Sequence, residues 1–415
     1  MQKGLGKIGL ILVAAGLCLT LLLAGAIPVC EAGPEERVVK IGWDAVLTGP
    51  LADTGVSATN GIMDYIRYIN EQGGMNGVKI AVEWQDTRGE IPRTILTHKR
   101  LRERGIVAEI NIVLGTVEAM IRDIQRDEIP MFMVTGHSAI TLLWPIPWVF
   151  TLFRTYRDHG VTPIMWLKED WTQERRPRVG MIAYDHISAR ETLEGLKWAC
   201  KEMGCEFVGA EIIPWTGAID TSTEWLRLTN KNADFIFVGT CGVSLVTVVK
   251  DAKRLGIMKR GIIVGHFEHC FDDALHIFRG DAEGWYVTRM VPALTRTELP
   301  GVKLLLEKAR EYRDWGPIES EGSYVVAWNA MPVLVEGIRL AIEKVGYENL
   351  TGRAVRDGLA SIKDFDNGFL PPITMSDECP YCINAEQMYQ IQGGRFRLVS
   401  DKWYSYPPIT YAISE

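Results

Sequence analysis

From Val38 onward, short runs rich in β-branched and aromatic residues alternate with stretches that have the spacing of amphipathic helices. This alternation predicts βαβ units and a mainly parallel sheet, so we expect a fold of the α/β class. The first predicted strands are 38–46, 78–84, 110–114 and 131–134, and the predicted helices between them are 58–71, 93–103 and 119–127.

The alternation stops at Trp144-Pro-Ile-Pro-Trp148, whose two prolines are incompatible with a regular helix and suggest a crossing between lobes. A second set of strands and helices follows, and the length of 415 residues allows more than one hydrophobic core. Its predicted strands are 179–184, 207–213, 235–238, 262–264 and 285–291, with a helix that ends at Met203. Two similar lobes in tandem are therefore expected.

The last part of the chain is predicted to return to the earlier lobes. Helices are expected at 302–313, 323–345 and 352–360, and they have no sheet of their own to cover. The tail at 388–404 has the pattern of strands joined by a turn at Gly393-Gly394. The lobes should therefore be joined by more than one crossover.

The first 32 residues have the layout of a secretory signal peptide. Lys3 and Lys7 precede an apolar run at 8–26, and cleavage is expected after Ala26 or Ala32. Export with a soluble mature protein is favoured over an uncleaved membrane anchor, and no later run looks long and apolar enough to span a bilayer. A GxGxxG match at 4–9 lies inside this segment with no strand before it, so it is not a dinucleotide site.

The charge balance and the absent motifs exclude several classes of function. A formal net charge of −7 and a pI near 5.7 argue against a nucleic-acid partner. Neither a P-loop nor a GxSxG elbow is present after the signal peptide, and no cofactor is implied. His266-Phe-Glu-His269 lacks a third ligand at a metal-binding spacing, so we expect neither a metal site nor an enzyme.

The motif Cys379-Pro-Tyr-Cys382 matches the thiol pair of glutaredoxin-like redox proteins. Redox catalysis needs the first cysteine at a helix N-terminus after a buried strand, because the helix dipole lowers the pKa of the thiol. Here the preceding residues are polar and the following ones are strand-like. A structural disulfide or inert thiols are favoured, with redox catalysis and metal binding as alternatives.

Four further cysteines bring the mature chain to an even six, which suits an oxidising compartment. Cys200 and Cys205 flank Gly204, which is expected to end a helix, so they are candidates for a short-loop disulfide or for two reduced core cysteines. Cys241 and Cys270 both follow predicted strands of the second lobe. They are candidates for a disulfide near a cleft.

The loop Thr48-Gly-Pro-Leu-Ala-Asp-Thr-Gly55 follows the first strand and is expected to open the first helix. Small residues at this place in an α/β sheet present backbone N–H groups to a ligand. Both enzymes and binding proteins use such a loop.

With this loop, several segments resemble the branched-chain amino acid type of periplasmic substrate-binding proteins, which are receptors of ABC importers. They lie at 70–77, 84–86, 129–138, 220–222, 238–240, 253–257, 280–287 and 324–341. The resemblance spans about 38–399 and implies a type I periplasmic binding fold, with two Rossmann-like lobes joined by three crossover segments. The first lobe would comprise 37–153 plus 291–380, and the second 156–288 plus 385–415.

The resemblance also implies which residues hold a ligand's carboxylate. The matching residues follow the third and fourth strands and are Thr116, Val117, Glu118, Gly136, His137 and Ser138. The hydroxyls of Thr116 and Ser138 would form an anion clamp beside helix N-termini, or would merely cap their helices. Glu118 would add an acid to the site or face solvent.

In the family an acidic residue of the second lobe meets the ammonium group of an amino acid, and Glu268 is the nearest match here. Tyr324 matches an aromatic position that faces the ligand. Where such receptors often place aromatic residues, this chain has Thr54, Ser188 or Ala189, and Cys241. The resemblance with these departures implies a larger pocket, suited to an aromatic acid or an amide.

Three functions follow from these observations. The leading one is a non-enzymatic, periplasmic or extracytoplasmic binding protein that delivers a small amino acid, or a related carboxylate or amide, to a membrane ABC permease. The second is a ligand-sensing or signalling domain of the same fold. The third is a CPYC thiol-disulfide oxidoreductase.

Overall fold

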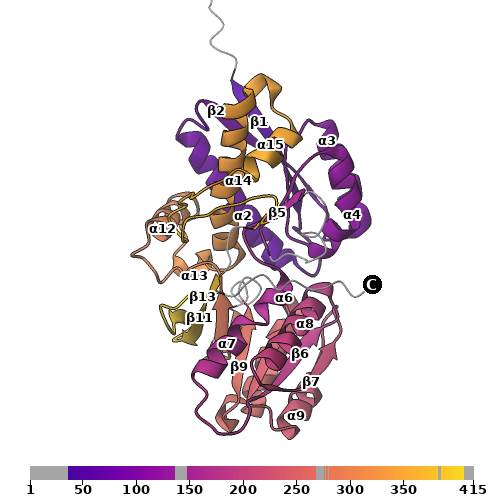
Figure 1. Cartoon of the computed structure of the whole chain (residues 1–415), viewed down its shortest axis with the longest axis vertical. Coiled ribbons are helices and arrows are strands. Elements are labelled where there is room, and N and C mark those ends of the chain that lie inside the picture. Colours follow the sequence, from indigo (N-terminus) through magenta and orange to yellow (C-terminus); the bar gives the residue numbers. More distant parts are fainter. Residues whose placement is uncertain are drawn as a thin grey trace, which may run out of the picture. The chain divides into compact units, whose positions relative to one another are not determined.

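The computed structural model describes residues 36–135, 147–267, 275, 277–278, 280–381 and 385–405. The described residues from Val38 onward form one compact unit, and the predicted signal peptide lies outside the described residues. Within this unit the strands form two separate sheets (Figure 1).

The first sheet has the strand order β2-β1-β3-β4-β5. Its strands are β1 (Arg37–Ala45), β2 (Val78–Asp86), β3 (Glu109–Asn111), β4 (Met131–Met133) and β5 (Val149–Thr151). The β1–β3, β3–β4 and β4–β5 pairs are parallel, as the alternation predicts. Since β5 follows the proline-containing segment, the chain leaves this sheet after Thr151 and not at 144–148.

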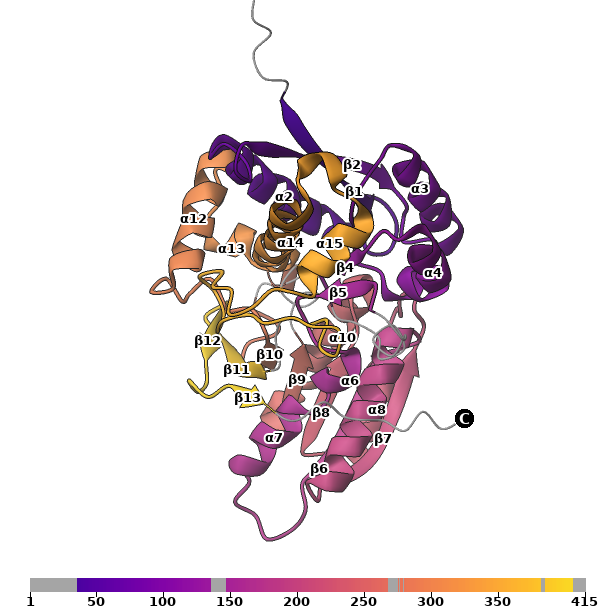
Figure 2. The same cartoon turned by 45° about the horizontal axis from the view of Figure 1, so that its top comes forward.

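Helices lie on both sides of the first sheet (Figure 2). One side carries α3 (Ile91–Glu103) and α4 (Leu114–Asp127), and the other carries α2 (Ala52–Glu71), α14 (Ser323–Val345) and α15 (Gly352–Leu359). Buried residues of α2, α14 and α15 share one apolar core with β1 and β3. The late helices thus cover the first sheet, as predicted.

Helix α2 begins six residues earlier than predicted, so Thr54 and Gly55 belong to its first turn. Gly55 makes this possible, because a Cβ there would lie 1.8 Å from the carbonyl oxygen of Val46. The first turn of the helix therefore passes directly against the end of β1. Only 46–51 remain as the loop.

Helix α14 has the bounds that the sequence predicts and lies at the centre of the first core. By length and composition α14 could cross a membrane, whereas we expected no such segment after the signal peptide. However, 78% of its most apolar window is buried inside the protein. Its composition is explained by burial, since α2, α12 (Pro300–Arg313) and α15 all pack against it.

The second sheet has the order β12-β11-β10-β9-β8-β6-β7, with β13 paired to β11. Its strands are β6 (Arg178–Tyr184), β7 (Glu206–Ile213), β8 (Phe235–Gly239), β9 (Ile263–Phe267), β10 (Tyr286–Arg289), β11 (Ala385–Gln392), β12 (Arg395–Leu398) and β13 (Tyr404–Ser405). Strand β11 runs antiparallel to β10 and β12. The predicted turn is confirmed, because Gly393 and Gly394 both have positive φ, at 61° and 69°.

The helices that accompany this second sheet in the described ranges include α6 (Tyr156–His159), α7 (Thr162–Glu169), α8 (Ile187–Glu202), α9 (Ser222–Asn230) and α10 (Gly242–Leu255). Of these helices, only α8 is predicted from the sequence. Helix α8 packs on β6 and β7, which places its N-terminus at the carboxyl end of the sheet (Figure 1).

The chain passes between the two sheets three times: after β5, after β10 and before β11. The predicted α/β fold of two lobes with three crossovers is confirmed. One core draws on residues between 39 and 153 and between 290 and 375, and the other mainly on residues between 156 and 293 and between 388 and 404. We propose the predicted ranges as the bounds of the two lobes.

Candidate functional site

A cavity of about 340 Å³ lies where loops of both lobes meet. Three stretches of the first lobe line it, one after each of β1, β2 and β3, and the second lobe contributes one residue after β6 and one after β7. The lining residues are Gly49, Pro50, Leu51, Arg88, Gly89, Glu90, Ile91, Val113, Gly115, Thr116, His186 and Trp215. Parallel strands share one carboxyl edge, which is where open α/β sheets bind ligands.

Helix N-termini surround this cavity. Helices α2, α3 and α4 all begin at or beside lining residues, and His186 is the N-cap of α8. The first N–H groups of a helix have no partner within it, and the helix dipole makes that end partly positive. The cavity therefore favours an anionic group.

Arg88 and Glu90 both line this edge, and Nε of Arg88 lies 3.5 Å from Oε1 of Glu90. The left-handed backbone of Arg88 (φ 59°) belongs to a turn in which Asp86 accepts hydrogen bonds from the backbone N–H groups of Arg88 and Leu47, at 3.1 and 3.0 Å. Burial would raise the pKa of Asp86, but these bonds and one from Thr48 outweigh it and keep the pKa below its usual value. An ionised Asp86 thus fixes the loops that carry Arg88 and Leu47.

The second lobe supplies an aromatic surface to the cavity. The rings of His186 and Trp215 stack with centroids 4.5 Å apart and an interplanar angle of 19°, and Tyr184 lies 5.2 Å from the ring of Trp215. Burial lowers the pKa of His186 to about 4, so its ring is neutral. Its Nδ1 lies 2.8 Å from the hydroxyl oxygen of Ser188. A neutral, stacked pair suits an apolar or aromatic ligand body.

The predicted clamp residues of the first lobe occupy different environments. Thr116 lines the cavity, but its hydroxyl donates to the carbonyl oxygen of Val113 at 2.7 Å. The side chain of Val117 is fully buried in a core with Met120. Glu118 is half-buried, and its Oε1 has no partner in the described part of the chain. Gly136, His137 and Ser138 lie outside the described residues.

The residues found where the family often has aromatic residues are not part of the cavity lining. Thr54 is buried in the first turn of α2, and its hydroxyl has no partner among the described residues. The hydroxyl oxygen of Ser188 lies 2.9 Å from that of Tyr184 and also contacts Nδ1 of His186. Ala189 is buried in the second core. Glu268 lies outside the described residues.

The Tyr324 side chain is not in the ligand-facing position that the resemblance implies. It is fully buried in the first core, and its hydroxyl donates to Asp64 at 2.9 Å. Arg313 donates to the same carboxylate at 2.8 Å. The ring therefore anchors α14 to α2, because its polar end is already engaged there.

The cysteines give a mixed result. Cys200 and Cys205 are free, buried thiols, which agrees with the alternative of two reduced core cysteines and not with the short-loop disulfide. The two thiols interact, and the backbone N–H of Cys205 donates to the carbonyl oxygen of Cys200 at 2.8 Å. Cys241 is disulfide-bonded, and Cys270 lies outside the described residues.

The CPYC motif does not begin a helix at its first cysteine. Cys379 is a free, half-buried thiol that donates to the carbonyl oxygen of Tyr381 at 3.6 Å, and Cys382 lies outside the described residues. Across the described ranges, no group of three or more His, Cys, Asp or Glu side chains is arranged to hold a metal ion.

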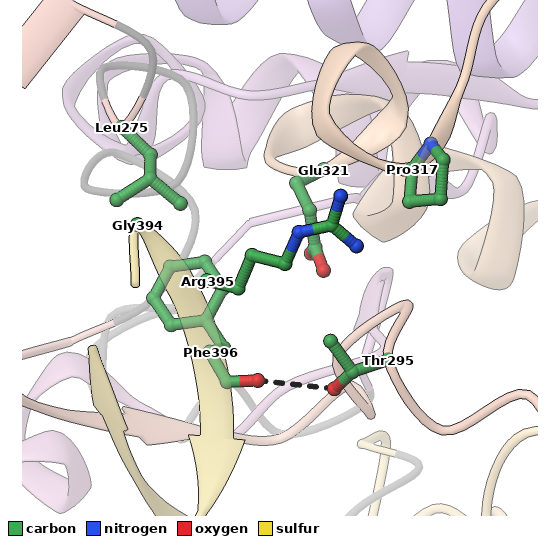
Figure 3. A pocket seen from close by; sticks show the side chains of 7 residues that line it. All are labelled: Leu275, Thr295, Pro317, Glu321, Gly394, Arg395 and Phe396. Carbon is green, nitrogen blue, oxygen red and sulfur yellow. Dashed lines mark hydrogen bonds between the residues drawn. The ribbon is translucent and has the colours of Figure 1, made fainter. Parts of the chain in front are cut away.

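A second, much smaller cavity of about 10 Å³ lies near the second crossover. Figure 3 shows the carboxylate of Glu321 and the side chain of Arg395 facing this space, and the hydroxyl of Thr295 donating to the carbonyl oxygen of Phe396 at 3.0 Å. The volume is at the lower limit for one water molecule, so it is not a ligand site.

Sequence reasoning missed Arg88, His186 and Trp215 as cavity residues. Their one common signal is position, since each follows the last residue of a strand by two residues. The spacing of the thirteen tryptophans in the sequence does not indicate which of them lies in a cleft. Trp215 reaches the cavity because the two lobes come together there.

Solved structures share this fold over almost their whole length. A branched chain amino acid ABC transporter protein from Thermus thermophilus with bound valine has a TM-score of 0.79 and 20% identity, covering 89% of this chain and 97% of that one. A solute binding protein from R. palustris in complex with benzoate has a TM-score of 0.75 and 15% identity, covering 87% and 95%. A fatty acid ABC transporter substrate-binding protein from Thermomonospora curvata has a TM-score of 0.75 and 16% identity, covering 90% and 94%.

No curated protein matches the chain. The family model described as periplasmic binding protein matches residues 38–394, which include the first sheet from Val38 on, the second sheet except β12 and β13, and all three crossovers. The chain therefore belongs to the periplasmic binding protein family.

Proposed function

We propose that this protein is a non-enzymatic, extracytoplasmic solute-binding protein that captures a small carboxylate in the cavity between its lobes and delivers it to an ABC importer. The observation that carries the proposal is the cavity of about 340 Å³, lined by strand ends of both lobes. Its volume lies in the range of about 300–1,000 Å³ that is usual for small-molecule sites.

The lining indicates the class of ligand. Helix N-termini and Arg88 would hold a carboxylate, while the His186–Trp215 stack would support an apolar or aromatic body. The similar structures contain valine and benzoate, and a third belongs to a fatty acid transporter. All three ligand types carry a carboxylate. Trp215 supplies the aromatic surface that Ser188 and Cys241 do not.

A ligand panel tests this proposal. Valine, leucine, benzoate, 4-hydroxybenzoate, octanoate and benzamide should be compared by thermal shift and isothermal titration calorimetry. A ligand at 100 times its Kd should stabilise the protein by about 2.7 kcal/mol. Benzamide, which lacks the charge, should bind more weakly than benzoate. Absence of any shift, together with no small molecule co-purifying in mass spectrometry, would contradict the proposal.

Matched tryptophan variants locate the site. Trp215→Ala should weaken binding of the best carboxylate at least about tenfold, since a stacked aromatic contact and its buried area are lost. Trp84→Ala is the control, because Trp84 is 47% exposed on β2 and does not line the cavity. Equal affinities of the two variants would exclude the proposed aromatic surface.

Arg88→Gln separates charge recognition from packing. It should lower the affinity for benzoate and leave that for benzamide nearly unchanged, because only the carboxylate pairs with the guanidinium. A parallel loss for both ligands would assign Arg88 a structural role.

Export and transport need tests in cells. We infer that residues 1–32 direct secretion, so the exported protein should begin after Ala26 or Ala32 when sequenced from its N-terminus. Deletion of the gene should abolish uptake of the radiolabelled ligand. Normal uptake with a changed transcriptional response would instead favour the signalling alternative.

A further inference from the structure

Two leucines of the first lobe reach across to the second lobe. Leu114 is the first residue of α4 and is only 2% exposed, and the apolar core that buries it is that of the second lobe. Leu51, the N-cap of α2, is half-buried and packs against the cores of both lobes. Helix α4 also contacts α8 of the second lobe (Figure 2). Apolar side chains therefore join the two lobes.

The position of Leu114 in the chain connects this contact to the cavity wall. Its neighbours Val113 and Gly115 line the cavity, and so does Thr116. Leu114 itself is not part of the lining, because its side chain is buried in the second lobe. Since α4 begins at Leu114, the contact holds the N-terminus of this helix at the edge of the cavity.

The loop after β1 makes a second contact with the other lobe. Gly242 is the first residue of α10, and a Cβ there would lie 3.0 Å from the carbonyl oxygen of Pro50, which lines the cavity. The N-terminus of a helix is partly positive and a carbonyl oxygen is partly negative, so the two attract each other. The φ of Gly242 is 57°, a conformation that also favours glycine. The lobes thus meet at two places on the rim of the cavity.

Both contacts depend on the lobes being close together. The chain crosses between the lobes after β5, after β10 and before β11, and neither contact belongs to these crossovers. A rotation about the crossovers that opens the cavity would separate the contacts and expose Leu51 and Leu114 to water. Closing buries this apolar surface again, which is favourable whether or not a ligand is bound.

We propose that Leu114 is an interlobe latch, which holds the two lobes closed over the cavity before a ligand arrives and thereby raises the affinity for that ligand. Leu114 is a positioning residue, since it does not line the cavity. The inference rests on the proposed function in one respect, namely that the cavity is the ligand site. The apparent Kd equals the intrinsic Kd divided by the closed fraction, so a protein that is mostly closed loses little affinity to the conformational change.

Leu114→Ala should open the ligand-free protein. Truncation of a buried leucine removes its packing from the closed form, whereas the open form loses little because the side chain is in water there. The ratio of closed to open molecules should fall at least about 30-fold. If about 90% of the wild-type molecules are closed, about 25% of the variant molecules should be, and the Kd of benzoate should rise about fourfold. Valine serves as the probe if benzoate does not bind.

Small-angle X-ray scattering measures closure without any ligand. The exported protein should first be unfolded in guanidinium, dialysed and refolded to remove bound molecules. The scattering curve of the wild type should fit closed lobes, and benzoate should change it little. Leu114→Ala should have a larger radius of gyration, which saturating benzoate returns to the wild-type value. Leu51→Ala replaces this variant in the scattering measurement if Leu114→Ala does not fold.

Two matched variants separate the latch from a general loss of apolar packing. Leu96→Ala is the exposed control, because Leu96 is 48% exposed on α3 and does not line the cavity. It should leave the scattering curve and the Kd unchanged. Leu114→Met nearly conserves the apolar volume, so it should stay close to the wild type in both measurements.

The outcomes separate the two proposals. A ligand-free wild type that is open, or a Leu114→Ala protein as compact as the wild type, overturns the latch. An equal change in Leu96→Ala, or a Leu114→Met protein that opens as far as Leu114→Ala, also overturns it. Failure of the whole ligand panel to bind, with the scattering as expected, overturns the proposed function and leaves the latch established.

Discussion

Replacing Arg289 by Met should strongly destabilise the protein. Arg289 ends β10 at the second crossover, and its fully buried guanidinium donates to Glu321 at 3.1 Å and to the carbonyl oxygen of Val291 at 3.1 Å. It also lies 4.5 Å from the ring centre of Phe396. Oε1 of Glu321 accepts from the N–H of Leu294 at 2.7 Å, so Glu321 would remain buried without its hydrogen-bonded cation, with the charge of Arg395 still acting on it.

The magnitude follows from the cost of a buried, uncompensated charge. Removing one partner of a buried ion pair costs about 3–5 kcal/mol. An unfolding entropy of about 2.1 cal/mol/K per residue gives about 0.8 kcal/mol/K for the roughly 380 residues of the unit 38–415. The melting temperature should therefore fall by about 4–6 °C in Arg289→Met.

Urea denaturation and differential scanning calorimetry measure this effect. The double variant Arg289→Met with Glu321→Gln should recover part of the loss, because no unpaired carboxylate remains. Arg227→Met is the control, since Arg227 is 60% exposed and its pair with Glu211 should contribute less than about 1 kcal/mol. A loss below about 1 kcal/mol for Arg289→Met, or an equal loss in the control, would refute the reasoning.

Three further outcomes are expected. Gly55→Ala should cost about 3 kcal/mol or more in urea denaturation, because its Cβ would meet the carbonyl oxygen of Val46, whereas Gly115→Ala has open space and should be nearly neutral. Native Glu109 holds its proton up to about pH 8, whereas the unfolded chain releases it near pH 4.5. The free energy of unfolding should therefore fall as pH rises, by about 2 kcal/mol from pH 6 to pH 7.5. A free energy of unfolding that does not change with pH would contradict the buried proton. Cys200 and Cys205 should resist alkylation in the native protein and react after unfolding, as peptide mass spectrometry would show.

Local patterns were sufficient to predict most strands and helices of this fold. Helix α14 and the turn at Gly393-Gly394 were predicted with their correct bounds, because a long apolar helix and a pair of glycines are strong local signals. The predicted first residues of the helices were less accurate. The true start of α2 depends on close contact between Gly55 and β1, which no local pattern records.

The candidate site was less predictable than the fold. Thr116 lines the cavity, but its hydroxyl donates to the carbonyl oxygen of Val113, so its role toward a ligand stays a prediction. Tyr324 matched a family position by sequence, yet Asp64 on α2 holds its hydroxyl in the core. A sequence position specifies where a side chain starts, whereas its direction depends on neighbours from distant parts of the chain.

By itself, the sequence determined that this chain builds parallel α/β lobes, because hydrophobic periodicity and turn residues act over a few positions. It also determined the family, through the order of many short segments. Only the tertiary structure decided that Arg88 lines one cavity with the His186–Trp215 stack, and that Glu109 is fully buried beside His98. The physical reason is that parallel strands bring together side chains that are tens of residues apart, and the resulting desolvation sets their charge.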